Sequence, residues 1–337
     1  MQTVALTGAA GFIGFHVAQA LLSRGVRVVG LDRMDSYYEI GLKQARLDLL
    51  VQDPGFSFHR LDIAETEALN QAFGGSEFDA FIHLAAQPGV RLSVEQPELY
   101  VHSNLVGFSR VLEWCRKSRC PHLIFASSSS VYGSESRMPY QESMAADHPK
   151  SFYGATKRCN EIMAHSYADL YGLPVTGLRF FTVYGPWGRP DMAPFKFTRK
   201  LLAGEPIDIY NHGNLSRDFT YVDDIVEGIL RVAARPAVGD PQFDTANPDS
   251  ATSQAPYRIY NIGQGKPVQL LRFVEVLEEC LGVQAVKNFL PMQPGDVYNT
   301  FADSGALQRD FGYQPQVTIE EGVGRFVRWY RHYYQVG

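Results

Sequence analysis

The sequence predicts an α/β protein, with a doubly wound parallel sheet followed by a smaller C-terminal α/β lobe. In the first half of the chain, short apolar runs alternate with longer stretches of helical periodicity, which is typical of βαβ units. A glycine-rich segment at residues 8–14 joins the first apolar run to the first helical stretch. The chain has 337 residues, of which 45% are hydrophobic and 20% charged, and this globular composition fits about two domains.

Five strands are predicted in the first half, each from a short apolar run. They are Gln2–Leu6, Val26–Leu31, Phe56–Leu61, Ala80–Leu84 and His122–Ala126. Helical periodicity between and after them covers residues 12–23, 39–52, 65–73 and 97–118. Because each helix can form a right-handed crossover between parallel strands, we expect helices on both faces of one buried sheet.

The second half of the chain changes character after residue 180. Residues 184–194 are rich in glycine and proline and predict a long irregular loop, and residues 237–256 predict a polar surface insertion. A strand is expected at Tyr257–Ile262, and helices at Val268–Leu281 and Ile319–Tyr334. We therefore expect a nucleotide-binding domain at 1–180 with a returning segment at about 217–262, and a substrate lobe formed by 181–216 and 263–337.

Charge and cysteine content exclude several classes of protein. Lys and Arg number 31 against 36 Asp and Glu, and the net charge of −5 disfavours a nucleic-acid binder, which needs a basic face. No apolar run approaches the roughly 18 residues of a membrane span, and the N-terminus has no targeting leader. The four cysteines form no C-x-x-C pair, so we expect no metal site, reduced thiols and a cytoplasmic location.

The segment T-G-A-A-G-F-I-G predicts a dinucleotide-binding loop of the Rossmann type. Gly8 permits a tight turn, Gly11 lets the backbone approach a pyrophosphate, and Gly14 allows helix and strand to pack closely. The helix that begins with Phe12 and Ile13 offers unpaired N–H groups and a positive dipole to the phosphates. A glycine triplet alone is weak evidence, but this one stands between a strand and a helix, as the motif requires.

Residues at two strand ends indicate which dinucleotide binds. Asp32 ends the second strand, where its carboxylate can accept both ribose hydroxyls and repel a 2′-phosphate, so we expect NAD rather than NADP. The adjacent Arg33 could accommodate that phosphate, but we interpret it as a solvated surface charge. Asp62 and Ile63 follow the third strand and are placed to meet the adenine.

Tyr153 and Lys157 form a predicted proton-transfer pair. They are four residues apart in Y-G-A-T-K, so on a helix they share one face. A lysine cation would lower the pKa of the Tyr153 phenol, and a phenolate can take a proton from an alcohol during hydride transfer to NAD⁺. The competing interpretation is a chance pair on an exposed helix. The serine run at 127–130 argues against it, because it supplies hydroxyls at the ligand-binding edge of the sheet.

Together these motifs resemble the extended short-chain dehydrogenase/reductase family, also called the NAD-dependent epimerase/dehydratase family. Six segments closely resemble those of UDP-glucuronate 4-epimerases: H-L-A-A-Q-P-G-V-R at 83–91, Y-G-A-T-K at 153–157, L-R-F-F-T-V-Y-G-P-W-G-R-P-D-M-A at 178–193, Y-N-H-G at 210–213, R-D-F-T-Y-V-D-D-I at 217–225 and M-Q-P-G-D-V at 292–297. The likeness covers nearly the whole chain. Pro88, Arg33 and the 237–256 insertion depart from the family pattern.

The resemblance implies roles for particular residues. Ser128, Tyr153 and Lys157 would be catalytic, with Ser127, Ser129 and Ser130 still open as the proton relay. It implies NAD binding by Gly8, Gly11, Phe12, Ile13, Gly14, Asp32, Asp62, Ile63, Leu84, Ala85, Ala86, Asn104, Tyr153 and Lys157. It implies UDP-sugar binding by Arg91, Ser128, Ser130, Thr182, Arg189, Arg217 and Asp296, with the Asp191–Phe197 stretch beside the nucleoside. Arg217 would meet the pyrophosphate, and Arg189 or Arg91 the sugar carboxylate.

The implied reaction is a redox-neutral epimerisation at C4 of UDP-glucuronate through a 4-keto sugar. A 4-ketone with a C6 carboxylate loses CO₂ readily, so the enzyme must hold the carboxylate near the plane of the ketone. The serine run lacks the acidic residue usual in decarboxylases of this fold and the Asp-Glu pair of 4,6-dehydratases. A UDP-glucose/UDP-galactose 4-epimerase is the nearest alternative, and a decarboxylase or a non-enzymatic NAD sensor is more distant.

The resemblance also implies a homodimer formed by two helices of each subunit. Helices at about 97–118 and 153–171 are expected to carry an apolar patch, which consists of Leu105, Phe108, Leu112, Met163 and Tyr167. Burial of these side chains inside the monomer is the competing interpretation.

Overall fold

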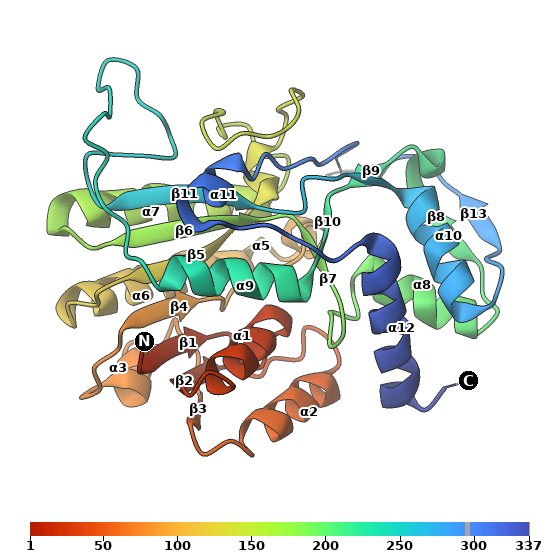
Figure 1. The fold of residues 1–337 in the computed structure, drawn as a ribbon, viewed down its shortest axis with the longest axis horizontal. Coiled ribbons are helices and arrows are strands. Elements are labelled where there is room, and N and C mark those ends of the chain that lie inside the picture. Colours follow the sequence, from red (N-terminus) through yellow and green to blue (C-terminus); the bar gives the residue numbers. More distant parts are fainter. Residues whose placement is uncertain (294–296, 337) are drawn as a thin grey trace.

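Seven strands form one parallel sheet in the computed structural model, which describes residues 1–293 and 297–336 (Figure 1). The strands are β1 Thr3–Thr7, β2 Arg27–Asp32, β3 Phe56–Arg60, β4 Ala80–His83, β5 Leu123–Ser128, β6 Val175–Phe180 and β11 Tyr257–Ile262. Their order is β11-β6-β5-β4-β1-β2-β3. The chain thus winds outward in both directions from the β1–β4 pair, which confirms the predicted doubly wound sheet.

Two strands extend the sheet beyond the five predicted in the first half. β6 pairs with β5 from Leu123↔Val175 to Ser128↔Phe180. β11 returns from late in the chain and pairs with β6, so the predicted strand at Tyr257–Ile262 lies at the edge of the main sheet.

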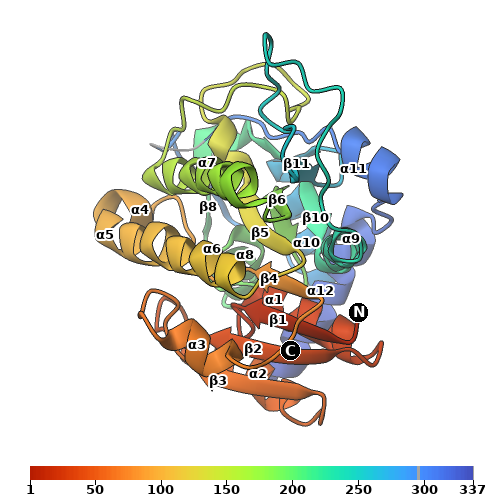
Figure 2. The same ribbon diagram turned by 90° about the vertical axis from the view of Figure 1, so that its left-hand side faces the viewer.

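Helices cover both faces of this sheet. They are α1 Phe12–Leu22, α2 Ile40–Leu50, α3 Ala68–Phe73, α6 Gly107–Lys117, α7 Phe152–Tyr171 and α9 Val222–Ala233. Because side chains alternate along a strand, Val4 and Leu6 of β1 pack into a cluster with α1, α2 and α9, whereas Ala5 joins the cluster of α3, α6 and α7. Figure 2 shows the layers, with α6 and α7 on one side of the sheet and α9 on the other.

The helix expected at 97–118 is built from three consecutive pieces. After the short α4 (Leu92–Glu95) come α5 (Pro97–Tyr100), a π-helical segment (Val101–Val106) and α6. Two residues of the predicted dimer patch, Phe108 and Leu112, are fully buried here against the sheet, so their assignment to a surface patch is wrong. Within the described residues, no helix combines the length and apolarity needed to cross a membrane.

A second lobe lies at the right of Figure 1. Its elements include α8 Ala193–Leu202, β8 Ile207–Ile209, β9 Ser216–Arg217, β12 Val268–Gln269, α10 Leu270–Leu281, β13 Lys287–Phe289 and α12 Ile319–Tyr334. The helix expected from Val268 begins at Leu270, because residues 268–269 pair with β9. The predicted loop follows β7 (Thr182–Tyr184), which pairs with β10 (Phe219–Tyr221). α11 (Gly305–Phe311) packs against α9, and the 237–256 insertion projects from the top in turns and irregular structure.

A buried ion pair joins α7 to the middle of the sheet. Glu161 and Arg179 are both fully buried and bond through two pairs of atoms, at 2.8 and 2.9 Å. The Ser127 hydroxyl donates to Glu161 at 2.6 Å, and Arg179 also donates to the Tyr132 hydroxyl at 2.9 Å. Burial alone would raise the pKa of Glu161, but the Arg179 charge holds that pKa below its usual value. The pair therefore anchors the serine run to the helix behind it.

We expect Glu161→Gln to lower the free energy of unfolding by about 3–5 kcal/mol, because it removes the buried carboxylate that Arg179 pairs with. Urea denaturation at pH 7 measures this change. The control Glu321→Gln breaks an exposed pair with Arg325 on α12 and should cost less than about 1 kcal/mol. Equal losses in the two variants would contradict the prediction.

Candidate active site

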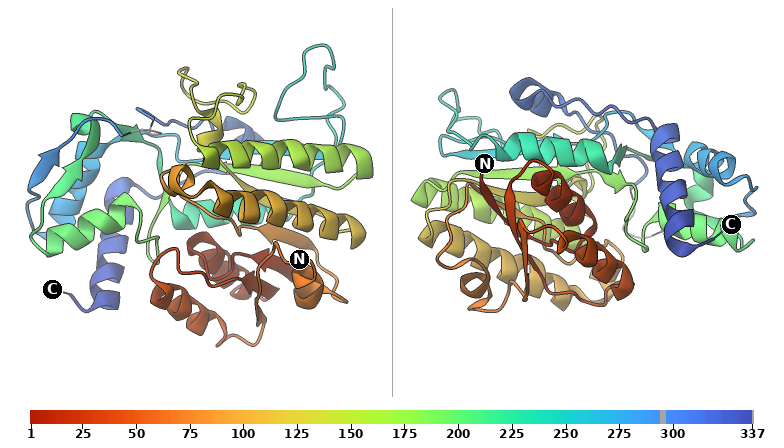
Figure 3. Two further views of the ribbon diagram at one scale, coloured as in Figure 1. Left: turned by 180° about the vertical axis from the view of Figure 1, so that it is seen from behind. Right: turned by 60° about the horizontal axis from the view of Figure 1, so that its bottom comes forward.

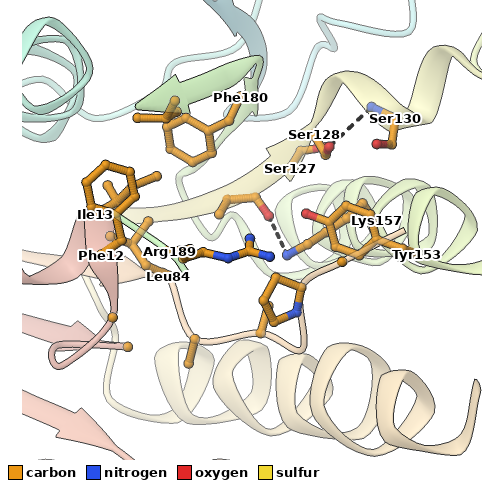
Figure 4. Close-up of a pocket in the computed structure, with 18 of the residues that line it drawn as sticks. Phe12, Ile13, Leu84, Ser127, Ser128, Ser130, Tyr153, Lys157, Phe180 and Arg189 are labelled. Atoms are coloured by element: carbon orange, nitrogen blue, oxygen red, sulfur yellow. Dashed lines mark hydrogen bonds between the residues drawn. The ribbon is translucent and has the colours of Figure 1, made fainter. Parts of the chain in front are cut away.

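A large cavity lies along the carboxyl ends of the central strands. Its volume is about 410 Å³, within the range of small-molecule sites. Most of the predicted site residues line it: Gly8, Gly11, Phe12, Ile13, Gly14, Asp32, Asp62, Ile63, Leu84, Ala85, Ala86, Ser128, Ser130, Tyr153, Lys157, Thr182, Arg189 and Arg217. Figure 4 shows the catalytic candidates and Arg189 around this space.

The glycine loop has the geometry that a dinucleotide pyrophosphate requires. Gly8 has a φ of +75°, and a Cβ there would lie 2.8 Å from the backbone nitrogen of Ala85. A Cβ on Gly14 would lie 2.0 Å from the carbonyl oxygen of Gly8. Gly11 is the N-cap of α1 and makes no side-chain cap, so it does not compete with a phosphate for the first-turn N–H groups of the helix. The described residues therefore fit a bound dinucleotide.

Arg33 differs from the solvated charge that we expected. Its side chain is 25% exposed, and its guanidinium donates to Asp35 at 2.6 Å, Gln87 at 2.8 Å and Ser103 at 2.9 Å. Asp32 beside it is buried and lines the cavity. These neighbours engage the guanidinium, and Arg33 lines the cavity together with Asp32.

Helix α7 brings Tyr153 and Lys157 into the cavity on one face, as their spacing predicted. Ser151 caps the helix by accepting a hydrogen bond from the backbone nitrogen of Gly154 at 3.0 Å. The Lys157 ammonium donates to the Ala126 carbonyl at 2.8 Å, directly before the serine run (Figure 4). This bond fixes how the helix sits against the end of β5.

The charges around Tyr153 differ from those that we expected. Burial raises the pKa of the Tyr153 phenol, and the Ser128 hydrogen bond and the Arg189 charge oppose this only in part. Burial also lowers the pKa of Lys157 to about 8. The pKa of the Tyr153 phenol is therefore raised overall and not lowered as we expected, and the Arg189 charge is a cation that opposes this rise.

The serine run presents its hydroxyls in different directions. Ser127 donates to Glu161, away from the phenol. Ser128 accepts a hydrogen bond from the Ser130 backbone nitrogen at 3.1 Å, and its hydroxyl lowers the pKa of the Tyr153 phenol. All four serines line the cavity, and Ser128 is the one whose hydroxyl acts on the phenol's pKa.

Arg189 is held by two residues that sequence analysis did not place beside it. Its Nε and Nη2 donate to Asp191 at 3.0 and 2.5 Å, and the Tyr37 hydroxyl donates to the same carboxylate at 3.0 Å. We expected Asp191 near the nucleoside, but the structure pairs it with the arginine. Tyr37 comes from the loop after β2, and nothing in the sequence pattern links it to residue 191.

Three predicted site residues are not among those that line the cavity: Arg91, Asn104 and Asp296. Arg91 does not line the cavity. It stands at the start of α4, with its guanidinium over the Tyr210 ring, 5.3 Å from the centroid. Asp296 lies outside the described residues.

Asn104 supports the cavity from behind instead of lining it. Its Oδ1 accepts a hydrogen bond from the Gln87 backbone nitrogen at 2.7 Å, and its Nδ2 donates to Thr156 of α7 at 3.1 Å. It therefore braces the turn after β4 against α7.

Arg217 lines the cavity and donates to the carbonyls of Ser216 and Tyr298. Among the residues described, no group of three His, Cys, Asp or Glu side chains could hold a metal ion.

Comparisons with known proteins identify the family. The model described as "NAD dependent epimerase/dehydratase family" matches residues 4–263. A probable UDP-glucuronate 4-epimerase from Rhizobium meliloti is 48% identical over 334 residues, which cover 98% of this chain and 97% of that protein. UDP-glucuronate 4-epimerase 1 of Arabidopsis thaliana is 45% identical and covers 98% of this chain and 77% of its own length.

Among solved structures, the chain is similar to UDP-glucuronic acid 4-epimerase from Bacillus cereus in complex with UDP-glucuronic acid and NAD. The TM-score is 0.87 at 32% identity, and the alignment covers 99% of this chain and 100% of that one. The predicted resemblance is confirmed, and the chain belongs to the NAD-dependent epimerase/dehydratase family.

Proposed function

We propose that this protein is a UDP-glucuronate 4-epimerase, which interconverts UDP-glucuronate and UDP-galacturonate. One observation carries the proposal: Tyr153, Ser128 and Arg189 line the same cavity as the glycine loop, so a proton acceptor, a hydroxyl and a cation surround one ligand space. The similarity to proteins named as UDP-glucuronate 4-epimerases supports this substrate. The glycine loop and Asp32 would hold NAD, which supplies the hydride acceptor and donor when bound.

Tyr153 and Ser128 would carry the proton. Tyr153 takes the proton of the C4 hydroxyl through Ser128 as the hydride leaves C4, and returns a proton as hydride comes back to the opposite face. No net oxidation results, since the proton and the hydride both return to the sugar. Lys157 would keep the phenol oriented by fixing α7 to the Ala126 carbonyl.

Arg189 is the proposed binder of the sugar carboxylate. Asp191 engages the guanidinium through Nε and Nη2, so a second carboxylate would approach the remaining edge. Because Asp191 and Tyr37 fix the arginine, the bound carboxylate would be held rigidly near the ketone plane, which disfavours loss of CO₂. Thr182 would contact the sugar, and Arg217 the pyrophosphate.

We also propose which lobe binds which ligand, and where the protein is located in the cell. Residues 1–180 with about 217–262 would hold NAD, and residues 181–216 and 263–337 the UDP-sugar. The four free cysteines support a reducing compartment, for which we propose the cytoplasm.

A homodimer through α6 and α7 is the proposed assembly. The two helices run side by side on one surface (Figure 3, left). With Phe108 and Leu112 in the core, the exposed apolar side chains lie on α7 and on the π-helical segment that leads into α6, and each is at least 39% exposed: Val101, Val106, Ile162, Leu170 and Tyr171. Solvent-exposed apolar groups on paired helices favour an isologous helical interface.

The proposed reaction predicts a particular product. Purified protein incubated with UDP-glucuronate should give UDP-galacturonate by NMR without added NAD⁺, because the reaction returns its hydride. Tyr153→Phe should lower kcat by about a hundredfold or more, since the proton acceptor is lost. UDP-xylose as the main product, or faster turnover of UDP-glucose, would overturn the substrate assignment, and full activity of the variant would overturn the proton route.

A further prediction uses the pKa of Lys157, which is about 8 in the folded protein and near 10.4 in the unfolded chain. Between these values the unfolded chain binds more protons, so this lysine's contribution to folding stability rises with pH from about 8 to 10.4. The difference in unfolding free energy between wild-type protein and Lys157→Met should therefore grow by about 3 kcal/mol between pH 8 and pH 10.4. Below pH 8 this difference should not change with pH. Urea titrations at several pH values test this, and a pH-independent difference would contradict it.

The proposed dimer can be tested by mutation. Ile162→Glu places a charge on the proposed interface and should convert the dimer to a monomer in sedimentation or light-scattering measurements. Val238→Glu, on the exposed 237–256 insertion, should leave the dimer intact. A monomeric wild type, or a dimeric Ile162→Glu protein, would contradict this assembly.

A further inference from the structure

Arg46 is a buried cation that the proposed chemistry does not use. It lies on α2 and has no exposed surface. Its Nη1 donates to the Ala10 carbonyl at 3.0 Å and to the Tyr38 hydroxyl at 2.7 Å. Its Nη2 donates to the carbonyls of Trp187 at 2.6 Å and Gly188 at 3.2 Å. One planar group thus holds three separate parts of the chain.

Two of these parts belong to the proposed ligand site. Ala10 lies within the glycine loop that would cradle the dinucleotide pyrophosphate, between Gly8 and Gly11. Trp187 and Gly188 directly precede Arg189, the proposed binder of the sugar carboxylate. We call the glycine loop the cofactor loop, and the segment that carries Trp187, Gly188 and Arg189 the substrate loop. The Arg46 guanidinium therefore joins the backbones of these two loops. Only a rigid fork with several donors can bridge both, whereas a lysine offers a single point charge.

The substrate loop needs support from outside itself. Trp187 has a φ of +59°, a left-handed conformation that a bulky residue adopts when its surroundings hold it there. The His16 ring, on α1, donates to the Pro186 carbonyl at 2.9 Å, and the Trp187 ring packs edge-on against Phe15 of the same helix, 5.5 Å between centroids. These contacts and the two Arg46 bonds dock the loop on elements of the nucleotide-binding half.

The charge of Arg46 also favours a bound anion nearby. The four oxygens that accept these hydrogen bonds carry no formal charge, so these bonds stabilise the buried cation through dipoles and not through an opposite charge. A pyrophosphate on the far side of the glycine loop would supply negative charge. The charge of Arg46 and its hydrogen bonds to the loops thus both favour binding of the dinucleotide at the glycine loop.

We propose that Arg46 is a positioning residue that couples the glycine loop to the loop carrying Arg189, so that a bound dinucleotide and a bound sugar carboxylate strengthen each other's binding. The coupling is reciprocal by thermodynamic linkage. The part that concerns the carboxylate rests on the proposed function. The part that concerns retention of the dinucleotide does not.

The experiment compares Arg46→Met and Arg46→Lys with wild type and with Arg27→Met, a control that removes an exposed arginine at the start of β2. NAD release is followed by rapid desalting and quantification of the NAD that stays bound. Affinities of the NAD-loaded proteins for UDP-glucuronate and UDP-glucose are measured by calorimetry.

We expect Arg46→Met to release NAD about tenfold faster, and to weaken UDP-glucuronate binding about fivefold or more while UDP-glucose binding changes less than about twofold. Arg46→Lys should fall between this variant and wild type, and Arg27→Met should match wild type. Circular dichroism checks the fold, and Arg46→Lys decides the question if Arg46→Met does not fold.

Wild-type rates and affinities in a folded Arg46 variant would overturn the proposal. Equal weakening of both UDP-sugars would also overturn the coupling, because it indicates general loosening and not a link to the carboxylate site. If wild-type protein does not bind or turn over UDP-glucuronate, the proposed function fails. The NAD-release measurement still decides the role of Arg46 at the glycine loop in that case.

Discussion

The docking of α7 on the end of β5 is the constraint on which the rest of the site depends. Tyr153, Lys157 and Glu161 are spaced by four residues and so share one helix face. Lys157 holds the Ala126 carbonyl, and Glu161 holds the Ser127 hydroxyl while paired with Arg179. These bonds fix the helix and the serine run relative to each other, so Tyr153 and Ser128 line one cavity because of how the core is built.

Burial sets the resting state of the phenol. Desolvation raises the pKa of Tyr153, so the phenol keeps its proton at neutral pH. A phenolate therefore forms only when positive charge brought into the cavity lowers that pKa. Arg189 already acts in that direction, and a cationic nicotinamide ring would add to it. Readiness for proton transfer is therefore tied to occupancy of the site, which suits an enzyme that must avoid side reactions of a ketone intermediate.

The fold was predictable from the alternation of apolar runs and helical stretches, except where tertiary contacts override local pattern. Strand β6 was not predicted, because Thr176 and Arg179 interrupt its apolar run. The buried Arg179 is tolerated there because it pairs with Glu161 and donates to the Tyr132 hydroxyl. Phe108 and Leu112 have the spacing of a helix face, but spacing does not tell whether that face meets the sheet or a second subunit.

The same reasoning explains which parts of the site the sequence indicates. Tyr153, Lys157 and the serines belong to one helix and one strand end, so their spacing carries the information. The environment of Arg189 depends on residues far away along the chain, such as Asp191's partner Tyr37, and on backbone carbonyls that Arg46 contacts. Every residue has a carbonyl, so no residue type marks such an acceptor. The residues that indicate the class of chemistry are thus close together in the sequence, whereas the surroundings of Arg189, the proposed carboxylate binder, depend on contacts between segments far apart along the chain.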